Sequence, residues 1–155
     1  MKLKLILTFL IFFQIFSKAQ VKMDISSKIP VDKYDKYEVC CIEQFKNIRG
    51  LIDPIENELR VYAYENISNA LAFKSGKVAK IIKGEGQSET VLLKTEDLIF
   101  VYSNLKNIRV RVGEEVSNNQ ILGQISTIDA ETFLGFQIWN DQLETINPIK
   151  YLEEN

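Results

Sequence analysis

The side chains that could perform chemistry are few in this chain, and histidine is missing from it altogether. Its 155 residues contain no histidine, and the only cysteines are the neighbours Cys40 and Cys41. Without imidazole, a nucleophile such as Ser103 would need a lysine or a carboxylate as its base, and the sequence offers it no evident partner. The adjacent carboxylates Glu114 and Glu115 would point in different directions along a strand, which is typical of a solvated turn. The sequence therefore argues against a hydrolytic site.

The cysteine pair leaves three interpretations open. Both thiols are buried or half-buried, or they form a disulfide with each other, or they pair with another chain. A disulfide between neighbours strains the intervening peptide and closes too short a loop to add much stability. Metal binding by Cys40 and Cys41 alone is not expected, because no third or fourth soft ligand accompanies them.

Residues 1–19 have the composition of a secretory signal peptide. Lys2 and Lys4 precede an apolar run over residues 5–16, and small residues at Ser17 and Ala19 predict cleavage before Gln20. The alternative, a membrane anchor, would need about 20 apolar residues. We therefore expect an exported protein, periplasmic or extracellular, with no membrane attachment after cleavage.

The overall composition indicates one folded domain. Hydrophobic residues make up 46% of the chain and charged residues 26%, with a formal net charge of −2. No basic stretch interleaves with aromatic residues, so nucleic-acid binding is not expected. No glycine-rich phosphate-binding motif occurs, so a nucleotide site has no support either.

The residues after the signal divide into an N-terminal extension (20–56), a β domain (57–152) and a short tail (153–155). Short apolar, β-branched runs separated by polar turns predict an all-β fold, an antiparallel sandwich or open barrel. The predicted strands cover residues 59–64, 76–82, 90–94, 98–102, 121–125 and 133–139, and 146–148 close the set.

Residues 57–152 resemble the LytM/lysostaphin-type zinc endopeptidases, which have the duplicated hybrid motif fold. The family patterns are A-x-x-D-G-x-V, Y-x-H-L, V-x-V-G-D-x-V, G-Q-x-I-G, H-L-H-F-E-V and N-P-x-x-Y-L. The matching segments here are 72–78, 102–105, 110–116, 120–123, 133–138 and 147–152. The resemblance implies a cell-wall peptidase fold and an exported protein.

The same resemblance implies that every site position has changed. In the family, zinc is bound by the His and Asp of an H-x-G-x-D segment and by the second His of H-x-H, and two further histidines are catalytic. Aligned without gaps, the zinc ligands fall on Asn57, Val61 and Gly135, and the catalytic histidines fall on Asn104 and Phe133. We therefore expect no zinc, no other cofactor and no catalytic residue.

The alignment near the first zinc ligand has a gapped alternative. Gly50 and Asp53 would then replace Asn57 and Val61, and one carboxylate would be recovered. One carboxylate does not make a zinc site, so the expectation of an inactive peptidase homologue stays the same.

The resemblance also suggests where a ligand would bind. The family's groove lies over the sheet face that carries the zinc, and here that face would present Asn57, Tyr62, Tyr102, Asn104 and Phe133. Amides and aromatic rings suit a peptide or a glycan. The alternative is that Phe133 fills the volume of the lost metal site and seals the groove.

Three functions remain open at this point. The first is a secreted pseudo-enzyme that binds peptidoglycan or regulates a cell-wall hydrolase, as inactive relatives of the family do. The second is an interaction module of an envelope assembly, which uses a sheet edge or the extension. The third is a divergent endopeptidase with an unrecognised site. A lipoyl-type carrier domain has little support, because neither Lys83 nor Lys94 has the surrounding signature.

Overall fold

The computed structural model describes residues 51–53, 56–63 and 68–154. The predicted signal peptide, the two cysteines and Gly50 lie outside the described residues. In the described part of the chain, no helix has the length and apolar character needed to span a bilayer.

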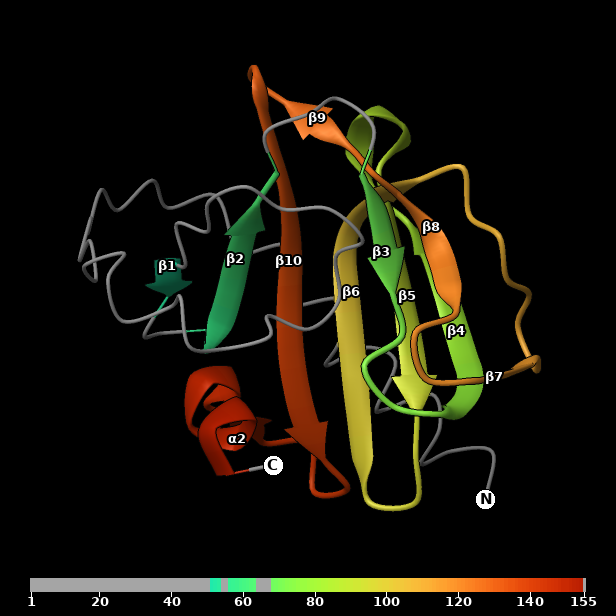
Figure 1. Cartoon of the computed structure of the whole chain (residues 1–155), viewed down its shortest axis with the longest axis vertical. Helices are drawn as coiled ribbons and strands as arrows, with labels where there is room; N and C mark the ends of the chain where they lie inside the picture. The colour runs from blue at the N-terminus through green and yellow to red at the C-terminus, as the bar shows by residue number, and fades with distance from the viewer. Residues whose placement is uncertain (1–50, 54–55, 64–67, 155) are drawn as a thin grey trace.

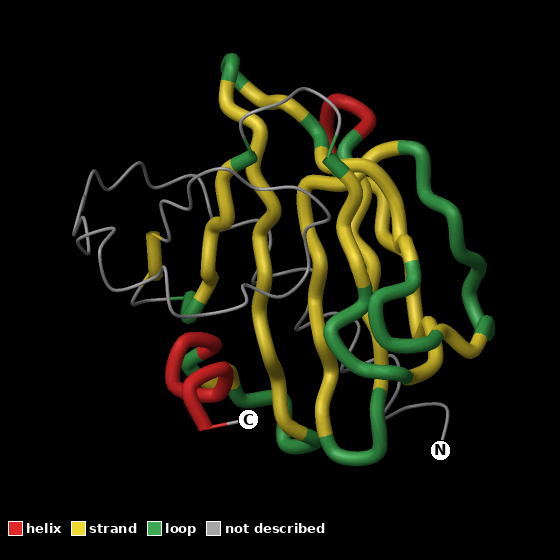
Figure 2. The backbone as a smooth tube through the Cα atoms, viewed as in Figure 1, coloured by secondary structure: helices red, strands yellow, loops and turns green. Residues whose placement is uncertain are grey.

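Antiparallel strands make up most of the structure, as Figure 2 shows, with two short helical pieces at opposite ends of the sheet. The strands are β1 Leu51–Asp53, β2 Glu58–Tyr62, β3 Asn69–Leu71, β4 Gly76–Lys83, β5 Glu89–Lys94, β6 Leu98–Lys106, β7 Glu115–Val116, β8 Ile121–Ile125, β9 Thr127–Ile128, β10 Glu131–Asn140 and β11 Thr145–Ile146. The helical pieces are the 3₁₀ turn η2 Glu85–Gln87 and the helix α2 Pro148–Glu154.

The strand order is β1-β2-β10-β6-β5-β4-β7, and β8 joins β6 to β3. Every pairing between the described strands is antiparallel. The structure thus confirms the predicted all-β class, as an open sheet. A tight turn joins β5 to β6, and there Thr95 Oγ1 accepts from the Leu98 amide at 3.2 Å.

The core lies between the main sheet and the smaller layer of β3 and β8, which crosses in front of β4 and β5 in Figure 1. Successive side chains of a strand point to opposite faces, so each strand sends alternate residues into this core. We call the face that contributes Phe100, Tyr102 and Phe136 the inner face. Phe100 and Phe136 are stacked with ring centroids 6.1 Å apart, and Phe73 approaches both edge-on.

The C-terminal segment was predicted only as a closing element, and the structure shows β11 followed by helix α2. Asn147 caps this helix, because its Oδ1 accepts from the amides of Ile149 and Lys150 at 3.0 and 3.2 Å, and Pro148 occupies the first helical position. The helix places the Tyr151 ring 6.1 Å from that of Phe100, at one end of the core.

Candidate functional site

The face of the sheet opposite the core, which we call the outer face, carries Gly135, the position on which the resemblance places the second histidine of H-x-H. Strand β10 places Phe133 and Gly135 on this face, since they lie two residues apart. The register sets Gly135 directly opposite Arg60 of β2 on one side and Ser103 of β6 on the other. Tyr62 is likewise opposite Phe133. Gly135, which aligns with the second histidine of H-x-H, therefore has Arg60 and Ser103 as its neighbours on the adjacent strands.

The space above Gly135 is filled by its neighbours. A Cβ atom added to Gly135 would overlap Ser103 Oγ and would lie 3.2 Å from the carboxylate of Glu58. A histidine side chain at this position would therefore have to displace both groups. The glycine is thus matched to its surroundings, which contain Ser103, weighed above only as a nucleophile, and Glu58, which the sequence did not single out.

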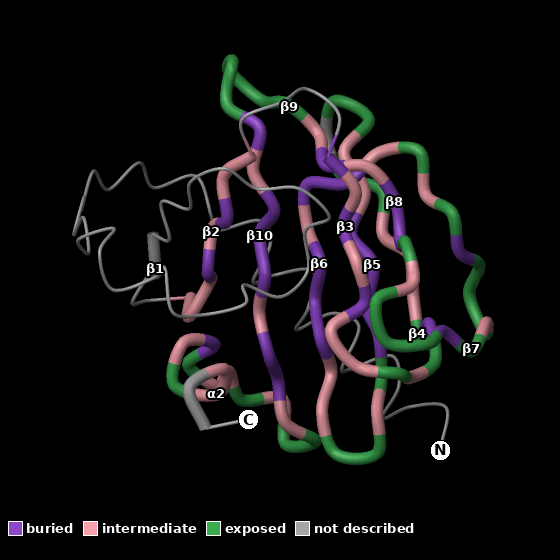
Figure 3. Tube along the Cα trace, viewed as in Figure 1, coloured by how far each residue is buried: buried purple, intermediate pink, exposed green. Residues whose placement is uncertain are grey.

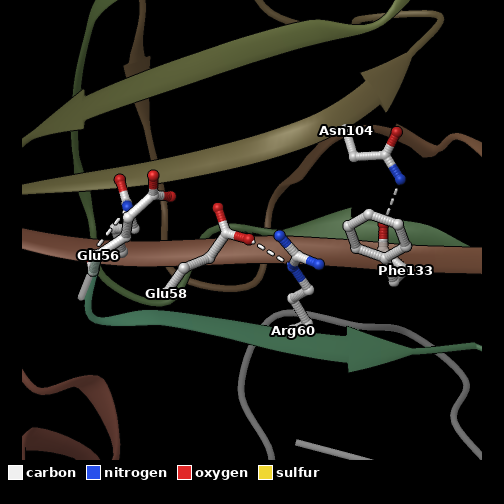
Figure 4. Close-up of polar contacts among 6 residues, drawn as sticks. Glu56, Glu58, Arg60, Asn104 and Phe133 are labelled. Carbon is white, nitrogen blue, oxygen red and sulfur yellow. Dashed lines mark hydrogen bonds and ion pairs between the residues drawn. The ribbon is translucent and has the colours of Figure 1, made fainter. Parts of the chain in front are cut away.

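Arg60 forms the centre of this cluster, as the close-up in Figure 4 shows. Its Nε donates to Glu58 Oε1 at 2.7 Å, and its guanidinium carbon lies 5.4 Å from the centroid of the Phe133 ring. The Phe133 ring in turn lies 5.5 Å from that of Tyr62. Burial raises the pKa of Tyr62, and the negative charge of Glu131 adds to the rise. The ion pair and the two rings form one cluster. We call Glu58, Arg60, Tyr62 and Phe133 together the outer-face cluster.

Val61, a zinc position in the ungapped alignment, does not share this face with Gly135. It lies opposite Leu134 and is buried in the core, whereas Arg60 lies opposite Gly135. A shift of one residue along a strand moves every side chain to the other face. Arg60, and not Val61, therefore shares the outer face with Gly135.

Asn104 has become part of the framework between strands. Its side chain is buried, with 5% exposed, and its Nδ2 donates to the carbonyls of Phe133 and Ser126 at 2.6 and 3.0 Å. Its backbone is left-handed, with φ of 62°, a conformation that asparagine tolerates better than most residues. Asn104 Oδ1 accepts no hydrogen bond from any described residue. The amide therefore fastens the end of β6 to β10 instead of facing a groove.

Tyr102, expected on the groove face, lies instead on the inner face. Its side chain is fully buried, and its hydroxyl accepts from the Phe73 amide at 2.9 Å. Burial raises the pKa of Tyr102 far above its ordinary value. The tyrosine is thus a core residue that holds the segment after β3, and it cannot contact a ligand on the outer face.

Asn57 lies away from the cluster. It is in the turn before β2, where its Nδ2 donates to Thr145 Oγ1 at 2.8 Å. Asp53, the carboxylate of the gapped alignment, belongs to β1 at the edge of the sheet, opposite Glu58. Of the predicted groove side chains, the structure brings Tyr62 and Phe133 together on the outer face, and Glu58 and Arg60 join them there.

The donor set at this site does not fit a zinc ion. A guanidinium has no lone pair to offer, glycine has no side chain, and Phe133 is apolar. Within the described ranges, no group of three or more histidine, cysteine, aspartate or glutamate side chains is arranged to hold a metal. The cluster offers a cation, a carboxylate and two aromatic rings. These groups can bind a ligand by ion pairing and stacking.

A separate cleft of about 590 Å³ opens at the end of the sheet near α2. The β3–β4 loop, the β5–β6 turn and Tyr151 line it, with Lys74, Glu96 and Asp97 among the charged residues. None of the outer-face cluster residues contributes to it. Its charges are mixed in sign, so they favour no ligand class.

Comparison with known proteins identifies the family. The sequence profile described as peptidase family M23 matches residues 60–148, which is more than half of the chain. The chain therefore belongs to peptidase family M23. No curated protein sequence matches the chain.

Solved structures agree with this assignment. A chain of the SpoIIQ–SpoIIIAH pore-forming complex superposes with a TM-score of 0.55 at 24% identity, over 60% of this chain and 62% of that one. Csd3 of Helicobacter pylori superposes with a TM-score of 0.59 at 18% identity, over 72% of this chain and 33% of Csd3. The antimicrobial peptidase lysostaphin of Staphylococcus simulans superposes with a TM-score of 0.57 at 17% identity, over 70% of this chain and 48% of lysostaphin.

These likenesses confirm the LytM/lysostaphin-type fold expected from the sequence motifs. All three identities are below 25%, so they establish fold and not function. The chain also spans less than two thirds of each of these relatives. Its own activity and partners must therefore be argued from its own residues.

Proposed function

We propose that this chain is a non-catalytic member of peptidase family M23. It is exported to the periplasm or the extracellular space of a bacterium, where it binds peptidoglycan or regulates a cell-wall hydrolase. The observation that carries the proposal is the Arg60–Glu58 ion pair beside Gly135, the position on which the resemblance places a zinc-binding histidine.

Charge explains why this arrangement disfavours zinc. A guanidinium stays protonated at any physiological pH, so Arg60 brings a fixed positive charge to the position of a divalent cation. Two like charges a few ångströms apart repel each other, and Glu58 is already neutralised by Arg60 at 2.7 Å. Since the chain also has no histidine, no imidazole is available to bind a metal or to move a proton.

The outer-face cluster has the composition of a binding surface. Tyr62 and Phe133 are half-buried and lie side by side, and Arg60 keeps 41% of its side chain exposed beside them. Aromatic rings stack on sugar faces and peptide side chains, and a guanidinium pairs with carboxylates. Peptidoglycan carries sugars, peptides and carboxylates together. Phe133 is thus only half-buried and lies beside a partly exposed guanidinium, which favours a usable site over a sealed one.

A second candidate is an interaction module of an envelope assembly. It is favoured by the likeness to a structure described as the SpoIIQ–SpoIIIAH pore-forming complex, in which the family fold occurs within a protein assembly. The two candidates differ in the first partner that they bind, a polymer or a protein.

The test is co-sedimentation of residues 20–155 with purified peptidoglycan. We expect the protein to pellet with the polymer, and Phe133→Ala and Arg60→Ala to weaken pelleting by about tenfold each, equivalent to about 1.4 kcal/mol. Arg111→Ala, which removes an exposed arginine from a loop, is the matched control and should bind like wild type.

Two results would count against the proposal. If the wild-type protein stays in the supernatant, peptidoglycan is not its ligand, and the interaction module becomes the better account. If Phe133→Ala and Arg60→Ala pellet as well as wild type, binding occurs elsewhere on the domain.

A further inference from the structure

The outer face carries a second feature, an apolar patch on the neighbouring strands. Leu92, Val101 and Trp139 have only 7%, 3% and 9% of their surface exposed, although they point away from the core. We call this group and its partly buried neighbours the outer apolar patch. Its members all come from the strands of the sheet or the turn after β10: Ile82, Leu92, Ile99, Val101, Trp139 and Leu143.

The strand register shows that these side chains share one face. Val101 lies opposite Leu92 of β5 on one side and Gln137 of β10 on the other. Gln137 is two residues from Gly135, so the patch continues the same face as the outer-face cluster. Trp139 completes it, with its Nε1 donating to Gln137 Oε1 at 3.2 Å.

The centre of the sheet is therefore buried on both sides. Four consecutive residues of β5, from Thr90 to Leu93, are buried, as are Phe100 to Tyr102 of β6. Figure 3 shows these buried stretches along the central strands. An antiparallel sheet with one solvated face alternates polar and apolar residues, and β2 does so. The apolar patch departs from that alternation, which is typical of a face that is covered.

We propose that residues 20–50 of this chain dock on the outer apolar patch. The chain enters the sheet at β1, and three steps in the strand order separate β1 from β6. At about 4.8 Å per step, that places the patch roughly 15 Å from β1. Roughly 30 residues span that distance easily, since an extended chain covers about 3.3 Å per residue.

The composition of residues 20–50 suits this role. Apolar residues alternate with charged ones in Val21–Ile25 and again in Tyr37–Val39. An extended segment with this alternation presents an apolar side to the patch and a charged side to water. The patch would then be an internal interface that joins the extension to the domain, next to the outer-face cluster and separate from it.

Trp139 is the only tryptophan of the chain, so its fluorescence reports on the patch directly. In residues 20–155 we expect a monomer in which acrylamide quenches Trp139 poorly and part of 20–50 exchanges its amide hydrogens slowly. Leu92→Glu places a charge in the patch and should raise both quenching and exchange several-fold. Lys94→Glu, two residues along the same strand, is the matched control and should change neither.

Hydrogen exchange of the wild-type protein decides the question even where Leu92→Glu does not fold. Exchange of all of residues 20–50 at unprotected rates would overturn the proposal. So would a concentration-dependent dimer in which dilution exposes Trp139, because the occupant would then be a second copy. If acrylamide quenched the fluorescence of Trp139 in a monomer as strongly as that of an exposed tryptophan, nothing would cover the patch and the proposal would be wrong.

Discussion

Asn104 provides the sharpest test of the idea that a catalytic position has become a structural one. Its amide donates to two carbonyls, at 2.6 Å to Phe133 and 3.0 Å to Ser126, from a buried position. Removing the donor leaves both acceptors without this partner. An unpaired buried group costs about 1–3 kcal/mol, and both bonds here are part-buried, so the loss of both is worth about 2 kcal/mol.

The backbone adds a second, separable contribution. Asn104 has φ of 62°, and a left-handed conformation costs alanine about 1–2 kcal/mol but costs glycine nothing comparable. We therefore expect Asn104→Ala to lower the free energy of unfolding by about 3 kcal/mol and Asn104→Gly by about 2 kcal/mol. Asn104→His, which restores the family residue, should also destabilise, because the imidazole must enter a site with 5% exposure.

Urea unfolding monitored by far-UV circular dichroism measures these differences, provided that the slope of the transition stays constant. Asn107→Ala is a matched control, since Asn107 also has a positive φ of 48° but makes its side-chain hydrogen bond at the exposed surface. If the alanine and glycine variants were both within 0.5 kcal/mol of wild type in stability, Asn104 would not have the structural role argued here. The loss of its two hydrogen bonds should cost more than that.

Three further predictions concern the framework around the site. Tyr102→Phe leaves the Phe73 amide unpaired and should cost about 1–3 kcal/mol by urea unfolding. Burial raises the pKa of Tyr102, so the native state keeps a proton that the unfolded chain loses above about pH 10. Wild-type stability should therefore fall above that pH, and Tyr102→Phe should fall less steeply. Gly135→Ala forces a Cβ against Ser103 and should cost about 1–3 kcal/mol, with partial recovery in the double variant with Ser103→Gly. Asn147→Ala removes the cap of α2 and should cost about 1 kcal/mol, seen as a lower midpoint in urea.

The sequence was sufficient to predict the major strands and the fold class. The strands around residues 76–82, 90–94 and 121–125 are β-branched runs bounded by polar turns, and the structure shows β4, β5 and β8 there. The shortest strands, such as β7 and β9, have too few residues to show a periodicity. They are held by their partners in the sheet, which a local pattern does not reveal.

Which face a residue occupies was harder to predict. Residues 98–102 are all apolar, because β6 is buried on both sides, so no alternation marks Tyr102 as an inner-face residue. In β2, the ungapped alignment put Val61 at a site position together with Gly135, whereas the strand register puts Arg60 opposite Gly135 and Val61 in the core. The cluster of Glu58, Arg60 and Phe133 depends on strand pairing between distant segments, and neither motif spacing nor composition contains that information.

The most direct test of the central claim is cleavage of purified peptidoglycan in the presence of added zinc. Residues 20–155 would be incubated with the polymer and Zn²⁺, and the release of free amino groups would be measured beside an active M23 endopeptidase. Our account predicts no release at any zinc concentration, because Arg60 and Gly135 stand where ligands are needed and the chain has no histidine. Zinc-dependent release that a chelator abolishes would contradict it and would show that the chain is an active peptidase.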